Sequence, residues 1–194
     1  MFPELESVLI DRERIATRVA ELGDQIARDA VSERDDGGLV LVPILTGALV
    51  FTADLIRRMP VKLSLRVVAV SSYPGTSMVS KGAKIRSELP LDLQGRRVLI
   101  VDDILDSGQT LGLVRELVEQ QGAADVRVCV LLRKPMSVRK RDVRAEYVGF
   151  DIPDRFVVGY GLDYDGYYRN IPEIAVLRAE AVVGAAPSPG GGGS

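Results

Sequence analysis

The sequence predicts an α/β fold in which a central, mainly parallel sheet is flanked by helices. Four apolar runs have the length of buried strands and lie at residues 39–45, 63–70, 98–101 and 126–132. Helical patterns or long loops separate these runs, as in the βαβ units that build a parallel sheet covered on both faces. We expect one domain at residues 1–180, followed by a flexible, Ala-, Pro- and Gly-rich tail at residues 181–194 that carries no function.

The spacing of apolar residues predicts three helices. Apolar residues recur at helical spacing over residues 11–31, which predicts an amphipathic helix that covers the sheet. A second helix is predicted over residues 48–59, because Pro60 cannot continue it. A third helix begins at residues 107–110 and continues through Val118.

Composition and charge exclude several kinds of partner. The chain has 25 basic and 27 acidic residues, and its net charge of −2 gives no general attraction to nucleic acid or anionic membranes. Cys129 is the single cysteine and lies in an apolar run, so we expect a buried, inert thiol in a reducing compartment. The N-terminus lacks the basic and apolar stretches of a secretory signal. We therefore expect a cytoplasmic protein that binds neither nucleic acid nor membrane.

Residues 37–53 contain no charge, and this uncharged stretch is close to the shortest length that spans a membrane. Pro43, Thr46 and Gly47 interrupt it. A strand, a tight loop and an amphipathic helix account for the same residues, so we do not expect a membrane span.

Three acids and a Ser-Gly pair stand between a predicted strand and the third helix. Asp102 and Asp103 directly follow the run at residues 98–101, and Asp106 comes shortly after them. In open α/β sheets, ligands bind outside the carboxyl ends of the strands, and a helix N-terminus offers free N–H groups to a phosphate. Paired carboxylates can accept hydrogen bonds from the vicinal hydroxyls of a ribose. The residues predicted to bind a ribose and its 5-phosphate are Asp102, Asp103, Asp106, Ser107, Gly108, Gln109 and Thr110.

This segment resembles the phosphoribosyl diphosphate binding motif of the type I phosphoribosyltransferases. A second stretch, residues 147–164 with the sequence YVGFDIPDRFVVGYGLDY, resembles one branch of them, the hypoxanthine-guanine phosphoribosyltransferases. The resemblance extends from about Leu39 to Leu177. It implies the type I phosphoribosyltransferase fold, with a small hood that binds the base.

The resemblance also implies an activity and its ligands. The chain would act in purine salvage and transfer the 5-phosphoribosyl group from phosphoribosyl diphosphate to hypoxanthine or guanine, giving IMP or GMP and diphosphate. The implied cofactor is Mg²⁺, and the implied assembly is a homodimer or homotetramer. Two alternatives stay open: a xanthine-preferring phosphoribosyltransferase, and an RNA-binding pyrimidine attenuation regulator on the same fold.

The resemblance assigns three further segments to the diphosphate. The loop after the first strand would contact it, often with a cis peptide bond between Leu45 and Thr46. The Ser- and Gly-rich loop at residues 71–82 would be a lid that closes over the diphosphate and excludes water. The residues implied to bind the diphosphate are Leu45, Thr46, Gly47, Ser72, Tyr73 and Arg169.

The resemblance also assigns residues to the purine and to the metal. It makes Phe156 the surface on which the base stacks. Backbone groups of Val157 and Asp163 would meet the edge of the purine. The carboxylate of Asp163 would bind Mg²⁺, together with Asp102 and Asp103.

Two further side chains are predicted to act on the purine. Asp106 is the candidate to accept or steer the proton near N7; alternatively, it caps the third helix. The family has a lysine for the purine 6-oxo group, expected a few residues before Tyr147, where this chain has Arg144. A guanidinium matches the O6 and N7 acceptors of guanine. The adjacent basic residues 139–141 are predicted to form a solvated loop. The alternative is that Arg144 only extends this loop and that Lys140 reaches the base.

Overall fold

The computed structural model describes residues 2–32, 38–71, 84–85 and 92–183. Its main sheet has the strand order β5-β4-β2-β6-β7-β8, with β3 also paired to β2. The strands are β2 (Leu39–Leu45), β3 (Leu63–Leu65), β4 (Val68–Ser71), β5 (Lys84–Ile85), β6 (Arg97–Leu105), β7 (Asp125–Arg133) and β8 (Tyr147–Asp151). All pairs are parallel except β4 with β5, so the predicted fold class is confirmed.

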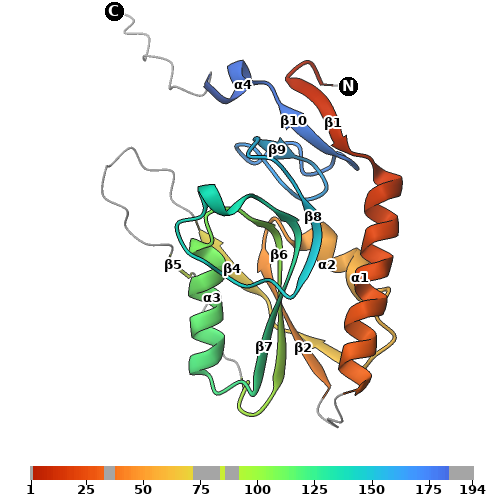
Figure 1. The fold of residues 1–194 in the computed structure, drawn as a ribbon, viewed down its shortest axis with the longest axis vertical. Coiled ribbons are helices and arrows are strands. Elements are labelled where there is room, and N and C mark those ends of the chain that lie inside the picture. Colours follow the sequence, from red (N-terminus) through yellow and green to blue (C-terminus); the bar gives the residue numbers. More distant parts are fainter. Residues whose placement is uncertain (1, 33–37, 72–83, 86–91, 184–194) are drawn as a thin grey trace, which may run out of the picture.

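Helices cover both faces of this sheet, and a smaller sheet stands over one end of it (Figure 1). The helices are α1 (Arg12–Ser32), α2 (Leu49–Ile56), α3 (Gln109–Gln120) and α4 (Ala179–Val183), with a short 3₁₀ turn at Met136–Val138. The small sheet, which we call the hood, contains β1 (Leu5–Ile10), β10 (Ile174–Leu177) and β9 (Val157–Val158), all antiparallel.

The core around the main sheet has two parts because the side chains of the central strands alternate between the faces of the sheet, and a third cluster lies in the hood. Leu41 and Leu99 pack in the cluster that includes α1 and α2. Val40, Val42 and Ile100 pack in the cluster that includes α3. The sheet is therefore buried on both faces, which explains why its strands read as continuous apolar runs.

Helix α1 and strand β2 form where they are predicted, whereas the strands predicted at residues 63–70 and 98–101 differ from expectation. Residues 63–70 form two short strands, because Pro43 of β2 has no N–H with which to continue the ladder on that side. The strand predicted at residues 98–101 continues to Leu105 and pairs with β7 along its whole length. Asp102 and Asp103 therefore lie within the strand and not after it.

The uncharged segment contributes β2, a loop and α2 rather than a single long helix. Within the residues that the structure describes, no helix has the length and apolar character needed to cross a membrane. Cys129 is buried in β7, as predicted, and burial raises the pKa of its thiol. The predicted boundary between domain and tail falls inside α4, and the tail beyond residue 183 lies outside the described residues.

Candidate active site

The acid pair lies near the carboxyl end of β6, in the middle of the sheet. Asp102 is only 7% exposed, and one of its carboxylate oxygens accepts a hydrogen bond of 3.0 Å from the backbone N–H of Asp103. Burial raises the pKa of Asp102 well above its usual range, and the neighbouring charge of Asp103 raises it further. Burial also raises the pKa of Asp103. The pair is therefore a place where a cation would relieve an unfavourable concentration of negative charge.

The predicted phosphate loop leads from β6 into α3. Gly108 precedes the helix with a φ of 78°, and a side chain at this position would overlap the carbonyl oxygen of Arg141. The backbone N–H groups of Lys140 and Arg141 each donate a hydrogen bond of 3.0 Å to the Ser107 carbonyl oxygen. The loop is thus held in place by residues 140–141. The N-terminus of α3, with its free backbone N–H groups, follows directly after it.

Two expectations about this region are wrong. Asp106 does not cap α3, because the residue before the helix is Gly108. The basic segment at residues 139–141 is not simply solvated. The side chain of Arg139 is only 8% exposed and donates a hydrogen bond of 2.9 Å to the Lys134 carbonyl oxygen.

The loop after β2 packs directly against the acid pair. The peptide bond between Leu45 and Thr46 is cis. A side chain at Gly47 would overlap the Asp103 carboxylate, and a side chain at Gly161 would overlap the Gly47 carbonyl oxygen. Glycine is required at both positions because backbone and carboxylate approach so closely. The segment predicted to hold diphosphate therefore adjoins the acids predicted to hold ribose.

Arg169 and Asp163 complete this side of the site. The Arg169 guanidinium donates a hydrogen bond of 2.7 Å to the Gly161 carbonyl oxygen and lies 2.7 Å from a carboxylate oxygen of Asp163. The other Asp163 oxygen accepts a hydrogen bond of 2.8 Å from the Gly166 N–H. The positive charge of Arg169 also partly offsets the raised pKa of Asp103. The predicted lid residues Ser72 and Tyr73 lie outside the described residues.

Phe156 lies just before β9 of the hood and is 42% exposed, in contrast to the buried Val157 beside it. The ring of Tyr164 meets the Phe156 ring edge to face, with 5.2 Å between centroids. An exposed aromatic ring held by a second ring is available for stacking. Phe156 is therefore not a core residue.

Lys134 is a site residue that the sequence interpretation missed. It directly follows β7, and its ammonium lies 3.0 Å from a carboxylate oxygen of Asp154 and 3.5 Å from one of Asp106. Its side chain is only 11% exposed. The position of Lys134 at the end of an apolar run was a usable signal, since ligands gather at the carboxyl ends of parallel strands.

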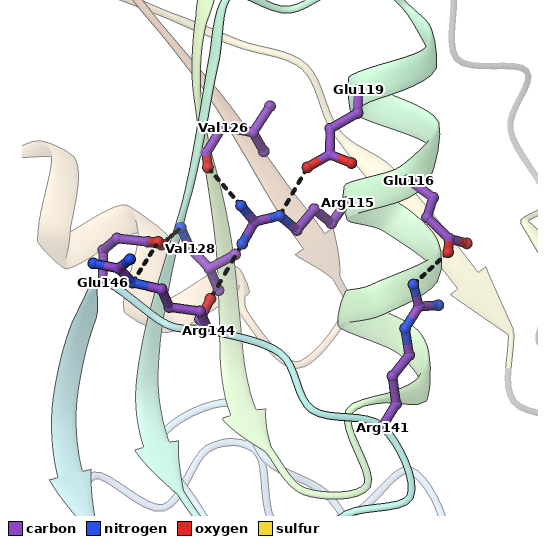
Figure 2. Close-up of polar contacts among 8 residues, drawn as sticks. All are labelled: Arg115, Glu116, Glu119, Val126, Val128, Arg141, Arg144 and Glu146. Atoms are coloured by element: carbon purple, nitrogen blue, oxygen red, sulfur yellow. Dashed lines mark hydrogen bonds and ion pairs between the residues drawn. The ribbon is translucent and has the colours of Figure 1, made fainter.

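Arg144, which the sequence interpretation assigned to the purine, does not lie near these residues. Its carbonyl oxygen accepts a hydrogen bond of 3.4 Å from Arg115, which also donates to the Val126 carbonyl oxygen near the start of β7 (Figure 2). The Arg144 side chain is 83% exposed and lies 3.4 Å from Glu146. Eight residues of strand, or about 26 Å at roughly 3.3 Å per residue, separate Val126 from Lys134. An arginine side chain cannot reach across that distance.

The acids of the site fit a hard cation. The described part of the chain has no group of three or more potential metal ligands. Mg²⁺ does not require one, because it commonly takes one or two carboxylates and completes its shell with substrate phosphate oxygens and water. Asp102 and Asp103, whose charges are destabilised by burial, supply this donor chemistry, and Asp163 lies on the neighbouring loop.

Comparisons with known proteins agree with this geometry. Residues 9–165 match the family model of the phosphoribosyl transferase domain. The chain is 44% identical to the hypoxanthine-guanine phosphoribosyltransferase of Mycobacterium tuberculosis over 90% of its length and 87% of that protein. It is 45% identical to the Bacillus subtilis protein of the same name, over 90% of this chain and 94% of that one.

A solved structure is also similar. Hypoxanthine phosphoribosyltransferase from Trypanosoma cruzi, in complex with the product IMP, matches with a TM-score of 0.83 and 36% identity. The match covers 93% of this chain and 98% of that structure. The family model and these relatives show that this chain belongs to the hypoxanthine-guanine phosphoribosyltransferase family of enzymes.

Proposed function

We propose that this enzyme transfers the 5-phosphoribosyl group of phosphoribosyl diphosphate to hypoxanthine or guanine, forming IMP or GMP and diphosphate in purine salvage. The observation that carries the proposal is that a buried acid pair, a helix N-terminus and a cation between two carboxylates meet at the carboxyl ends of the paired strands β6 and β7. The exposed ring of Phe156 follows two residues after Asp154, one of those carboxylates.

The ribose 5-phosphate binds at the loop of residues 107–110. Its phosphate oxygens accept hydrogen bonds from the free N–H groups at the start of α3, where the helix dipole favours negative charge. The ribose hydroxyls donate to Asp102 and Asp103, directly or through a metal.

The diphosphate lies between Thr46, Gly47 and Arg169. Breaking the bond between ribose C1 and the diphosphate oxygen develops positive charge on the sugar and negative charge on the leaving group. Arg169 stabilises the leaving group through charge-assisted hydrogen bonds. Asp102, Asp103 and Asp163 would hold Mg²⁺, which supplies further neutralisation of the diphosphate when it is bound.

The base stacks on Phe156 with its six-membered ring edge toward Lys134. The ammonium of Lys134 donates to the 6-oxo group of hypoxanthine or guanine, whereas adenine presents a donor there and is rejected. Asp106 lies beside the same ammonium and accepts the proton that the purine loses as its nitrogen attacks C1.

A panel of bases tests this proposal. The purified protein is incubated with phosphoribosyl diphosphate and Mg²⁺, and diphosphate release is measured with hypoxanthine, guanine, xanthine, adenine and uracil, with and without a chelator. Hypoxanthine and guanine should be converted, adenine and uracil should not, and the chelator should abolish turnover. Activity on xanthine or uracil alone would contradict the proposed substrates, and undiminished turnover with the chelator would contradict the metal.

We also propose an assembly and a compartment for this protein. A homodimer or homotetramer would cover exposed apolar side chains such as Leu49 of α2, which is otherwise in contact with water. Light scattering on the purified protein measures the assembly, and a monomer would contradict it. The free thiol of Cys129 suits the cytoplasm.

A further inference from the structure

We propose that Asp154 is a positioning residue that fixes the ammonium of Lys134 and thereby sets the preference for 6-oxopurines. This inference rests on the proposed function, since it concerns the group that would meet the purine 6-oxo oxygen. It adds a residue that makes no contact with the substrate itself.

The ammonium of Lys134 is held by carboxylates from two different elements. Asp106 follows β6 and lies 3.5 Å away, while Asp154 follows β8 and lies closer, at 3.0 Å. The carbon stem of Lys134 is buried, so the position of the charge depends on these two partners. Because the Coulomb attraction between opposite charges grows as their distance falls, Asp154 attracts the ammonium more strongly than Asp106 does.

The backbone of Lys134 is fixed independently of Asp154. Its N–H donates a hydrogen bond of 3.0 Å to the Leu105 carbonyl oxygen, and its carbonyl oxygen accepts one of 2.9 Å from Arg139. Loss of the Asp154 carboxylate would consequently release the ammonium without releasing the chain that carries it. This separation makes the role of Asp154 testable.

An ammonium has three N–H donors and no acceptor. Within the described part of the chain, the ammonium is paired with two carboxylates, those of Asp106 and Asp154, and it has a further N–H to offer a ligand oxygen. Without Asp154, the ammonium moves to Asp106, its remaining partner, and away from the base. The purine then loses a charge-assisted hydrogen bond, while the ribose and diphosphate contacts stay intact.

The test is steady-state kinetics of Asp154→Ala with its neighbour as a matched control. KM for hypoxanthine should rise about tenfold, the loss of one charged hydrogen bond, while KM for phosphoribosyl diphosphate changes by less than about twofold. Asp154→Asn, which keeps an acceptor but loses the charge, should fall between the parent and Asp154→Ala. Asp151→Ala removes an ion pair between the last residue of β8 and Arg133, the last residue of β7, and should leave both KM values unchanged.

A second background separates positioning from a general structural effect. In Lys134→Met, adding Asp154→Ala should have no further effect on KM for hypoxanthine, because the group that it positions is gone. An unchanged KM for hypoxanthine in Asp154→Ala, an equal rise in both KM values, or the same rise in the Lys134→Met background would each overturn the inference. A parent enzyme that converts no 6-oxopurine would instead overturn the proposed function.

Discussion

Lys134 and Arg144 are two long cationic side chains at opposite ends of the β7 and β8 pair. Lys134 is buried between two carboxylates at the carboxyl end, whereas Arg144 is solvent-exposed beside Glu146 at the other end. Only Lys134 lies near the residues predicted to meet the purine. Selectivity for the base should therefore depend on Lys134 and not on Arg144.

Lys134→Ala should raise KM for hypoxanthine by about 10- to 100-fold, because one charged hydrogen bond of roughly 1.5–3 kcal/mol is lost. Arg144→Ala should be indistinguishable from the parent. Steady-state kinetics with hypoxanthine, guanine and adenine compare the two variants. The reverse pattern, with Arg144→Ala impaired and Lys134→Ala unaffected, would contradict the site described above.

Substitutions of the three acids near the end of β6 should affect different kinetic constants, because Asp106 is proposed to act in the chemical step and Asp102 and Asp103 in binding. Asp106→Asn should lower kcat by about 10²-fold or more, the range of a lost general base, with KM for phosphoribosyl diphosphate little changed. Asp102→Asn and Asp103→Asn should mainly raise KM for phosphoribosyl diphosphate. Kinetics of the three variants distinguish these roles, and equal losses of kcat in all three would count against them.

Asp102 should reduce the stability of the free enzyme at neutral pH. Because burial raises the pKa of Asp102, the folded state binds its proton more tightly than the unfolded state does. The free energy of unfolding should therefore fall as the pH rises through that raised pKa. Asp102→Asn removes this charge and should unfold at a higher urea concentration than the parent at pH 8, by a margin that shrinks toward pH 4. A lower urea midpoint for Asp102→Asn at pH 8 would refute this interpretation.

At the scale of residues, the sequence predicts the acids of the site but not Lys134. Asp102, Asp103 and Asp106 stand together in the chain, and three acids between a strand and a helix are a local signal. Lys134 is a single residue whose partners lie about 20 to 30 positions away in the sequence. Its role depends on which strands are neighbours in the sheet, and that information is not local.

At the scale of elements, the long apolar runs predict the central strands β2, β6 and β7 but not their ends, and they do not predict the hood strands β1, β9 and β10. The β6 ladder continues past its apolar residues because β7 offers backbone partners as far as Arg133. Backbone pairing thus carries two acids into the sheet, where burial raises the pKa of each. The positions of the ends matter here, because they decide that the acids are buried and not in a solvated loop.

Because the loop after β2 packs closely against the end of β6, the site should be sensitive to substitution at Gly47. In Gly47→Ala, the added methyl group would overlap the Asp103 carboxylate and displace it. Because small displacements of reacting groups are costly, kcat/KM for phosphoribosyl diphosphate should fall roughly 10- to 100-fold.

Gly95→Ala provides the control for Gly47→Ala. Gly95 has a φ of 70° and open space around it, so this change adds backbone strain without a contact near the site. Its kcat/KM should equal that of the parent. If Gly47→Ala behaves in the same way, the loop after β2 does not shape the diphosphate site.

At the scale of the whole molecule, the site is a product of topology. Parallel strands direct all their carboxyl ends to one edge, and the hood stands over that edge (Figure 1). The alternation of apolar runs with helical patterns is sufficient to predict this edge. It does not predict that Gly47, Asp103 and Gly161 touch, since these contacts depend on how three separate loops pack.

The most direct test of this account is a crystal structure of the enzyme with IMP bound. The phosphate should lie at the N-terminus of α3, the purine should stack on Phe156, and the ammonium of Lys134 should lie within hydrogen-bond distance of the purine O6. A nucleotide bound with its base beside Arg144, or with O6 directed away from Lys134, would contradict the account.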